Sequence, residues 1–359
     1  MAEGSSTDLT YPFHTPPGHG TAREVVPGLR WVRMRLPFPP DHINLWLIEE
    51  PASEDDPRDG WTVVDTGFGV EATRALWEQH FAQTMGGKPL KRIVVTHYHP
   101  DHLGNAQWLA ERFATKQGAL IVEMSLTELL AAHSVAEGSG AYQRSNLAAF
   151  FRAHGLTEDQ IDVTANRGNT YSFGVPTRPP CCNRIMPGDT VEMGGKFWSA
   201  IGGYGHTTEH LSFYCEELKV LISGDMLLPK ISTNINVWPV TPLADPVTDY
   251  VGSLQAFKYC EADTLVLPSH GLPFRGIASR VEALETHHED RMNELYGAVA
   301  DAPKTAAELI PTLFRRKLDN HQLFFAIAEA VAHVNHGWRI GRLTRDVGDD
   351  GRIRFGLAA

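Results

Sequence analysis

The stretch THYHPDH, residues 96–102, constrains this chain most, because it sets three histidines and an aspartate directly after a run of β-branched residues. In an extended segment alternate side chains share a face, so His97, His99 and Asp101 are expected to point the same way. Where Asp101 begins a helix, the chain turns and His102 points elsewhere. Two ligand pairs therefore diverge from one loop, which can serve two metal ions about 3.5–4 Å apart.

Three further candidate ligands stand at the ends of other predicted strands. His206 lies on the glycine-rich turn YGHTTEH, Asp225 ends VLISGD, and His270 ends TLVLPSH. Each alone has a structural alternative, because a strand-end aspartate often caps a turn and a lone histidine is commonly a core residue. Together with the histidine cluster they predict one metal site, presented by a rigid scaffold at a common edge.

The remaining pattern predicts a fold of the α+β class. Successive strands often follow too closely for helical crossovers, which favours layered sheets with helices outside over a doubly wound parallel sheet. Strands are expected at 29–38, 43–50, 61–67, 92–97, 119–124, 211–217, 220–225 and 264–270, a hairpin at 190–197, and helices at 71–84, 103–116, 246–260 and 276–300.

Changes in composition along the chain predict its domains. Residues 1–24 are rich in Gly, Pro, Ser and Thr and are expected to be flexible, and 25–300 are expected to form the catalytic domain. Within it, 138–180 is interpreted as an insertion that covers the substrate or makes a dimer contact. Residues 301–359, with two helices and a hairpin, predict a small winged-helix-like C-terminal domain.

The net charge and the cysteine content indicate which binding partners and which cellular compartment to expect. A formal net charge of −11 argues against a surface built mainly to bind nucleic acid or anionic lipid. No run of about 18 apolar residues is present, so no membrane partner is expected. The first residues do not read as a signal peptide and the four cysteines do not read as a disulfide framework, so a cytoplasmic location is expected.

The order HxHxDH, GHT, SGD and a late strand-end histidine resembles the metallo-β-lactamase-fold hydrolases over about residues 25–300. The resemblance implies an αββα sandwich with the metals at one edge. It also implies a ligand set: His97, His99 and His206 for one metal, Asp101, His102 and His270 for the other, and Asp225 bridging both. VVDTG resembles the family's strand-end Asp-Thr-Gly, which makes Asp65 a support for the ligand loop.

The resemblance also indicates which branches of these hydrolases the chain is similar to. True β-lactamases of this fold commonly have Cys or Ser where Asp225 stands, so antibiotic hydrolysis is not the expected activity. With its tail the chain resembles a lactamase-like branch that carries a C-terminal module, and some members of that branch cleave single-stranded RNA. The core also resembles hydroxyacylglutathione hydrolases, which cut thioesters, although their glutathione-contacting tail is not recognisable. Quorum-lactone hydrolases carry a Tyr shortly after the bridging Asp, where this chain has Met226, Leu227 and Leu228.

The leading hypothesis is a dinuclear metal-dependent hydrolase of a small thioester, ester or lactone. Zn²⁺ lowers the pKa of bound water to about 7, and a hydroxide that bridges two metals would attack, with Asp101 and Asp225 as the catalytic carboxylates. Five His and two Asp suit two Zn²⁺ best, and Fe or Mn also accept such ligands. Tyr204 and Lys230 are candidate substrate contacts because they neighbour His206 and Asp225 in sequence.

Two alternatives stay open. The C-terminal module could place RNA for an endoribonuclease or phosphodiesterase, although nine Lys or Arg against six Asp or Glu from residue 303 onward give a net charge of only +3. An iron-dependent redox or binding use of the same fold is the third reading. The segment HQLFFAIAEAVAHV is apolar on more than one face, which favours packing onto the main domain or in a homodimer.

Overall fold

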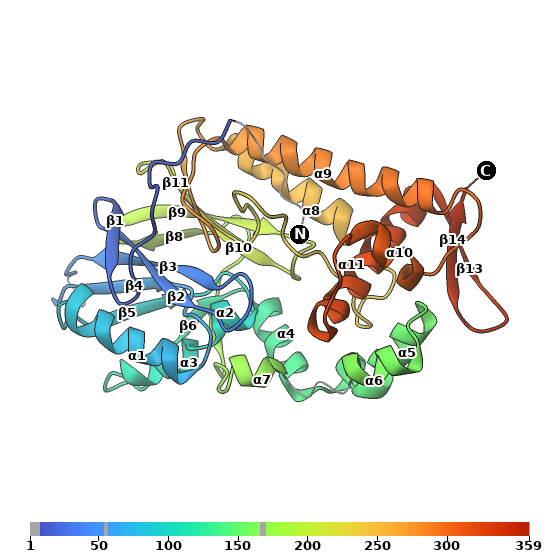
Figure 1. Cartoon of the computed structure of the whole chain (residues 1–359). Coiled ribbons are helices and arrows are strands. Elements are labelled where there is room, and N and C mark those ends of the chain that lie inside the picture. The colour runs from blue at the N-terminus through green and yellow to red at the C-terminus, as the bar shows by residue number, and fades with distance from the viewer. Residues whose placement is uncertain (1–7, 54–56, 166–169, 359) are drawn as a thin grey trace.

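The computed structural model describes residues 8–53, 57–165 and 170–358. Two β-sheets lie face to face with helices on both outer faces, and a smaller helical body extends from one end of this sandwich (Figure 1). The expected αββα arrangement is therefore confirmed, with a C-terminal part made of helices and a small sheet.

The first sheet changes from antiparallel to parallel along its width. Strands β1 to β4 form a meander, and β4 to β7 run parallel with helices in the connections, as parallel neighbours require. Its strands, in spatial and sequence order alike, are β1 (Ala22–Val26), β2 (Leu29–Arg35), β3 (His42–Glu50), β4 (Gly60–Val64), β5 (Leu90–Val94), β6 (Val122–Met124) and β7 (Cys182–Arg184).

The second sheet is antiparallel except at one edge, where β11 and β12 are parallel neighbours joined through a helix. The expected Gly-Gly hairpin joins β8 to β9, since both Gly194 and Gly195 take the positive φ that such a turn needs. Its spatial order is β12 (Leu265–Pro268), β11 (Val220–Gly224), β10 (His210–Cys215), β9 (Lys196–Gly203) and β8 (Thr190–Met193).

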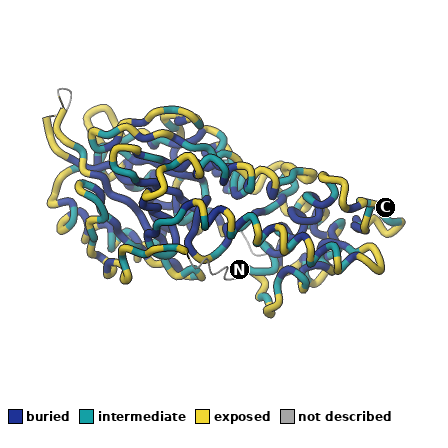
Figure 2. Tube along the Cα trace, turned by 90° about the horizontal axis from the view of Figure 1, so that it is seen from above, coloured by how far each residue is buried: buried dark blue, intermediate teal, exposed yellow. Residues whose placement is uncertain are grey.

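The space between the sheets is filled by large apolar side chains. Trp31 and Trp46 stack with ring centroids 6.2 Å apart, and Trp198 and Phe213 face them from the second sheet, all at most 1% exposed. Burying one such tryptophan contributes roughly 4–6 kcal/mol of transfer free energy. Figure 2 shows buried residues concentrated along the middle of the molecule, so the strand ends lie on a rigid support.

Helices cover both outer faces of the sandwich. Beside the first sheet lie α1 (Glu71–Gln79) with its π-helical extension His80–Thr84, α2 (Pro100–Leu103), α3 (Ala106–Arg112) and α4 (Leu126–Glu137). Beside the second lie α8 (Pro246–Leu254), which continues as a 3-10 turn to Tyr259, and α9 (Ile277–Ala298).

The helix expected over 103–116 is divided, and the division serves the ligand loop. A Cβ on Gly104 would lie 2.4 Å from the Pro100 carbonyl oxygen, so only glycine fits between α2 and α3. The side-chain amide of the next residue, Asn105, donates to the carbonyl oxygens of Thr66, Gly67 and Phe68 at 2.9–3.2 Å. The chain breaks its helix here to hold the loop that follows β4.

The C-terminal part contains α10 (Ala306–Leu313), α11 (Asn320–Arg339), β13 (Leu343–Val347) and β14 (Ile353–Leu357). Both helices begin with capping boxes, Thr305 with Glu308 and Asp319 with Gln322, which satisfy their free N–H groups. The expected two helices and hairpin are therefore present, and the winged-helix label itself stays a prediction. We call residues 301–358 the C-terminal module.

The 138–180 insertion packs against the C-terminal module of the same chain. Its helices are the 3-10 turn Gly140–Tyr142, α5 (Arg144–Ala153), α6 (Glu158–Ala165) and α7 (Thr170–Gly174). Phe151 of α5 contacts Phe324 of α11 with ring centroids 5.6 Å apart, and the His154 carbonyl accepts a hydrogen bond from the Ala307 N–H. Part of the surface that was expected to cover substrate or a partner copy is therefore used inside the chain.

The described part of the N-terminal segment is paired with the main domain. Thr10 and Arg275 exchange two backbone hydrogen bonds, at 2.9 and 3.2 Å, and β1 already begins at Ala22. Within the segment 1–24, the backbone is therefore hydrogen-bonded at Thr10 and from Ala22 onward, to the β12–α9 connection and to β2, and the flexibility expected of the segment stays a prediction. Among the described helices, none combines the length and apolar character that crossing a bilayer requires.

Candidate metal centre

Seven side chains that are distant in sequence meet at one edge of the sandwich. The loop after β5 supplies two of them and α2 supplies two, while the others follow β9, β11 and β12. All come from the ends of strands, where the packed sheets hold the backbone and leave the side chains free to converge. They form two groups whose donor atoms lie within 4.8 Å of one another: His97, His99, His206 and Asp225, and Asp101, His102 and His270.

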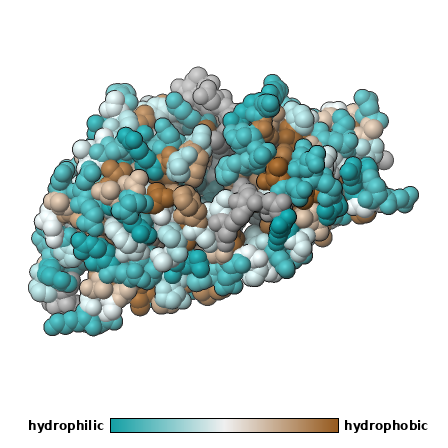
Figure 3. All heavy atoms as spheres, turned by 60° about the horizontal axis from the view of Figure 1, so that its bottom comes forward, coloured by the Kyte–Doolittle hydropathy of each residue, from teal (hydrophilic) through white to brown (hydrophobic). Residues whose placement is uncertain are grey.

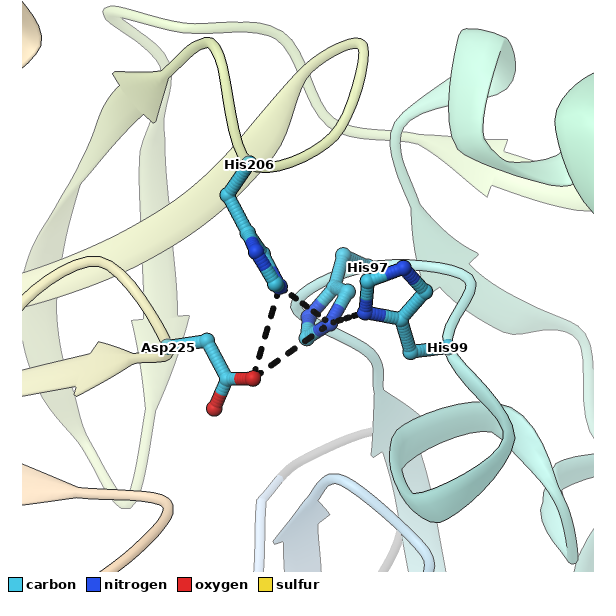
Figure 4. A group of neighbouring side chains, drawn as sticks. All are labelled: His97, His99, His206 and Asp225. Carbon is cyan, nitrogen blue, oxygen red and sulfur yellow. Dashed lines mark hydrogen bonds and ion pairs between the residues drawn. The ribbon is translucent and has the colours of Figure 1, made fainter. Parts of the chain in front are cut away.

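The first group surrounds a small volume near the surface (Figure 4). The Nε2 atom of His97 lies 2.9 Å from His99 Nδ1 and 3.3 Å from His206 Nε2. Asp225 closes the group, since its Oδ2 atom is 3.4 Å from His206 Nε2. Three ring nitrogens and one carboxylate oxygen thus point at a common centre, as the ligands of a bound metal do.

The second group lies beside the first, and Asp225 reaches both. Its other oxygen, Oδ1, is 3.5 Å from His102 Nε2 and 3.5 Å from His270 Nε2. Asp101 Oδ2 is 3.4 Å from His270 Nε2. His102 Nε2 and Asp225 Oδ1 are fully buried and have no hydrogen-bond partner within the described chain, which is costly unless another group satisfies them. A cation between these two atoms would satisfy both.

Two ring orientations are fixed by backbone acceptors on the far side of the ring. His206 Nδ1 donates to the Asn234 carbonyl at 2.7 Å, and His270 Nδ1 donates to the His42 carbonyl at 2.8 Å. Because a carbonyl oxygen can only accept, each Nδ1 must carry the hydrogen, and each Nε2 then presents a lone pair to the centre. A ring held in this tautomer is prepared to bind a metal.

Asp65 fixes the ring orientation of His102 in the same way. Its Oδ2 atom accepts a 2.7 Å hydrogen bond from His102 Nδ1, and its Oδ1 atom accepts one from the Thr96 N–H at 2.8 Å. The residue is buried and takes a φ of 63°, a left-handed conformation that costs a non-glycine residue energy. The carboxylate therefore joins β4 to the start of the ligand loop, where the sequence predicted a support.

Two supporting residues carry no sequence signal. Glu128, on α4, accepts hydrogen bonds from the Tyr98 N–H at 2.9 Å and the Glu209 N–H at 2.7 Å. It thereby joins the loop of His97 and His99 to the loop of His206, although burial raises its pKa. His42 accepts the Gly271 N–H at 2.9 Å beside His270. Neither stands in a motif, so only the folded chain could identify them.

The electrostatics of the site favour a cation. Burial, followed by the nearby His206, lowers the pKa of His99 to about 3, and burial also holds the pKa of His97 well below its ordinary value. Burial acts the same way on His102, but the carboxylates of Asp65 and Asp101 outweigh it and raise its pKa. The acids of the second group thus attract positive charge to this position, which a metal ion can supply with the imidazoles neutral.

Neither of the two proposed substrate contacts belongs to the ligand groups. Tyr204 is 41% exposed, and its hydroxyl lies 3.1 Å from the position that a Cβ on Gly202 would take, which turns it back along its own strand. Lys230 is exposed, and among residues 8–53, 57–165 and 170–358 its ammonium has neither a hydrogen bond nor an ion pair. Both assignments stay predictions. His210 is buried and accepts the Asp225 N–H at 3.2 Å, the structural role its position indicates.

Family models match both parts of the chain. The model of the metallo-beta-lactamase superfamily matches residues 38–270, and that of the metallo-beta-lactamase-like C-terminal domain matches residues 292–358. The first match contains all seven converging side chains, and the second contains the whole C-terminal module.

Two solved structures and two curated proteins extend this likeness. A beta-lactamase domain protein from Burkholderia ambifaria is 43% identical, with a TM-score of 0.90 over 98% of this chain and 99% of that one. A metallo-beta-lactamase family protein from Thermus thermophilus is 28% identical, with a TM-score of 0.75 over 93% of this chain and 100% of that one. The probable metallo-hydrolase YqjP of Bacillus subtilis is 22% identical over 85% of this chain and 90% of its own length. A linear primary-alkylsulfatase from a Pseudomonas species is 27% identical over 64% of this chain, but the match spans only 42% of that protein.

Proposed function

Because this chain belongs to the metallo-β-lactamase superfamily and is a metal-dependent hydrolase, we propose that its centre holds two metal ions and hydrolyses a small thioester, ester or lactone. The observation that carries the proposal is the position of Asp225, which directs one carboxylate oxygen to each group of ligands. A single-metal site would leave the second group, with two imidazoles and a buried carboxylate, without a purpose.

The donor set supports zinc as the metal. Five imidazoles and two carboxylates match the borderline-soft ligands that Zn²⁺ prefers, and no thiolate lies in either group. Iron and manganese accept the same donors, so the metal in the isolated protein is the decisive measurement between the hydrolytic proposal and the redox alternative.

When bound, the metal pair would lower the pKa of water toward 7 and polarise the substrate carbonyl. The chain's own residues supply the rest. His206 and His270 are locked by backbone carbonyls, so the ligands need little reorganisation during turnover. Asp101, with Oδ2 3.4 Å from His270 Nε2, is placed to orient the attacking water and to accept its proton. The buried apolar layer under the site excludes bulk water from one side.

Two alternative substrates should be tested in the same assay. One relative is named a linear primary-alkylsulfatase, which makes a sulfate ester an alternative to a carbonyl substrate. RNA is the other, proposed through the C-terminal module. Some of that module's cations are already paired, Arg354 with Asp350 at 2.7 Å and Arg315 with Glu294 at 2.8 Å. We therefore favour the small carbonyl substrate.

The test combines metal analysis with a substrate panel. Protein purified without chelator should contain close to two zinc ions per chain and should hydrolyse at least one of a thioester, an ester and a lactone in preference to an alkyl sulfate, a cephalosporin and single-stranded RNA. Asp225→Ala should lose at least one metal ion and about 10³-fold of the activity, because it removes a ligand from both groups. Asp301→Ala, an exposed acid away from the site, serves as the matched control. Full activity in metal-free protein would contradict the proposal.

A further inference from the structure

A row of aromatic rings connects the catalytic domain with the C-terminal module. Neighbouring ring centroids are 5.8 Å apart for Phe173 and Phe68, 5.4 Å for Phe68 and Phe38, and 6.3 Å for Phe38 and His321. The row continues at 5.2 Å from His321 to Phe325 and at 6.3 Å from Phe325 to Trp238. We call these six residues the aromatic belt.

The belt is attached to the segments that orient the metal ligands. The Phe68 ring and the Pro100 side chain both approach Gly174, and Pro100 directly precedes Asp101. Phe38 lies four residues before His42, whose carbonyl orients His270. Trp238 lies four residues after Asn234, whose carbonyl orients His206. The belt is therefore joined, through Gly174 and Pro100, to the helix that carries Asp101.

Phe68 is buried in the core at 4% exposure, but most of the belt is more exposed. Phe173 is 65% exposed, and Phe38, Trp238 and Phe325 are only partly buried, although side chains of this size are normally buried when they serve stability alone. Figure 3 shows the face on which α7 lies, where the surface is hollowed between the two parts of the molecule and hydrophobic atoms gather on both sides of the hollow.

Both parts of the chain contribute to this surface. Phe38, Phe68 and Phe173 belong to the catalytic domain, while His321 and Phe325 lie on α11 of the C-terminal module. A backbone hydrogen bond of 3.1 Å from the Val237 N–H to the Ala328 carbonyl fixes α11 against the segment that carries Trp238. This junction places rings of α11 in the same row as rings of the catalytic domain.

We propose that the aromatic belt binds an extended apolar group of the substrate, so that the enzyme acts on esters or thioesters that carry a chain of several methylene groups. The inference rests on the proposed hydrolase function. A row of aromatic rings gains free energy by covering methylene groups of a ligand. The chain can belong to the acyl side or to the leaving group, and these two sources are separable by experiment.

The experiment measures kcat/KM of the zinc-loaded protein on two series of thioesters. One series varies the acyl group from two to ten carbons on a fixed small thiol, and the other keeps acetyl and varies the thiol in the same way. We expect kcat/KM to rise by about fourfold for each added methylene in one series, the equivalent of about 0.8 kcal/mol per buried CH₂. The series that shows the rise identifies the side of the scissile bond that the belt covers.

Each belt variant should weaken this dependence while changing the rates on short substrates little. Phe325→Ala and Phe173→Ala should lower kcat/KM about tenfold on the ten-carbon substrate and less than twofold on the two-carbon one. Phe173 is largely exposed, so its variant should fold even if Phe325→Ala does not. Phe197→Ala, a 70% exposed phenylalanine on β9, is the matched control and should leave both values unchanged.

A binding measurement separates failure of this inference from failure of the proposed function. In calorimetry, decanoate should bind the zinc-loaded protein at least tenfold more tightly than butyrate, and Phe173→Ala should reduce the difference whether or not any thioester is hydrolysed. Equal affinities in the wild type, or chain-length effects as steep in both belt variants as in the wild type, would overturn the inference. Loss of a dimer in Phe173→Ala with unchanged chain-length dependence would also overturn it, by assigning the belt to contact between two copies.

Discussion

The metal centre and the aromatic belt are held together by opposite means. At the metal centre, His102, His206 and His270 each have a hydrogen-bonded acceptor on the far side of the ring. In the belt, rings such as Phe38 and Phe68 meet by apolar contact alone. Directional bonds fix an atom to within a fraction of an ångström, whereas apolar contact fixes only a surface. We therefore expect the metal centre to determine the reaction and the aromatic belt to determine the range of substrates.

The largest expected effect separates function from fold. Removal of metal with a chelator should lower the hydrolytic activity by at least about 10⁴-fold, because water then keeps its ordinary pKa. The far-UV circular dichroism should hardly change, because the sheets are held by an apolar interior that contains no metal ligand. Adding Zn²⁺ back should restore the activity. Collapse of the secondary structure on chelation would show that the metal centre also holds the fold.

A substitution in the core is expected to lower the stability and to leave the metal content unchanged. Trp198→Ala should lower the free energy of unfolding by about 3–5 kcal/mol, since this fully buried ring packs between the sheets. The metal content of the protein that stays folded should remain unchanged, as measured by denaturant titration together with metal analysis. The adjacent Phe197 is 70% exposed, and Phe197→Ala should change stability by less than about 0.5 kcal/mol. Equal losses in both variants would contradict this account.

Acid should weaken the C-terminal module through a buried histidine. Burial lowers the pKa of His333 on α11 to about 4, whereas an unfolded histidine titrates near 6.5. Between these values the unfolded state binds more protons, so stability falls as the pH drops from 6.5 to 4, by up to about 3 kcal/mol. His333→Gln should reduce this slope in unfolding titrations, and His14→Gln, an exposed control, should not. An unchanged slope in His333→Gln would exclude this histidine as the cause.

The smallest effect tests how far orientation matters at the centre. Asp65→Asn keeps the shape of the side chain but weakens its hydrogen bond to His102 Nδ1, and should lower metal affinity about 10–100-fold. Competition with a chelating dye measures this directly. Asp59→Asn, at an exposed acid that pairs with Lys88, should leave the affinity as it is. Unchanged affinity in Asp65→Asn would mean that packing alone positions the ring.

The sequence anticipated the fold class and the convergence of the seven polar side chains, because each stands in a short motif at the end of an apolar strand. It also anticipated the contact of Asp65 with the ligand loop. It did not reveal Glu128, which lies in a helical pattern like any other surface acid. It predicted one helix over 103–116, whereas the helix is divided at Gly104 and Asn105. The division arises because Asn105 hydrogen-bonds to carbonyl groups of a loop that is far away in the sequence.

Local chemistry determined which residues of this protein can bind a metal, since imidazole and carboxylate spacing near a strand end is visible in the amino-acid order itself. Only the tertiary structure decided that one carboxylate, Asp225, reaches both groups, and that aromatic rings from α11 join rings of the catalytic domain. The physical reason is that a ligand motif consists of residues close together in the sequence, whereas a surface forms when segments hundreds of residues apart pack together.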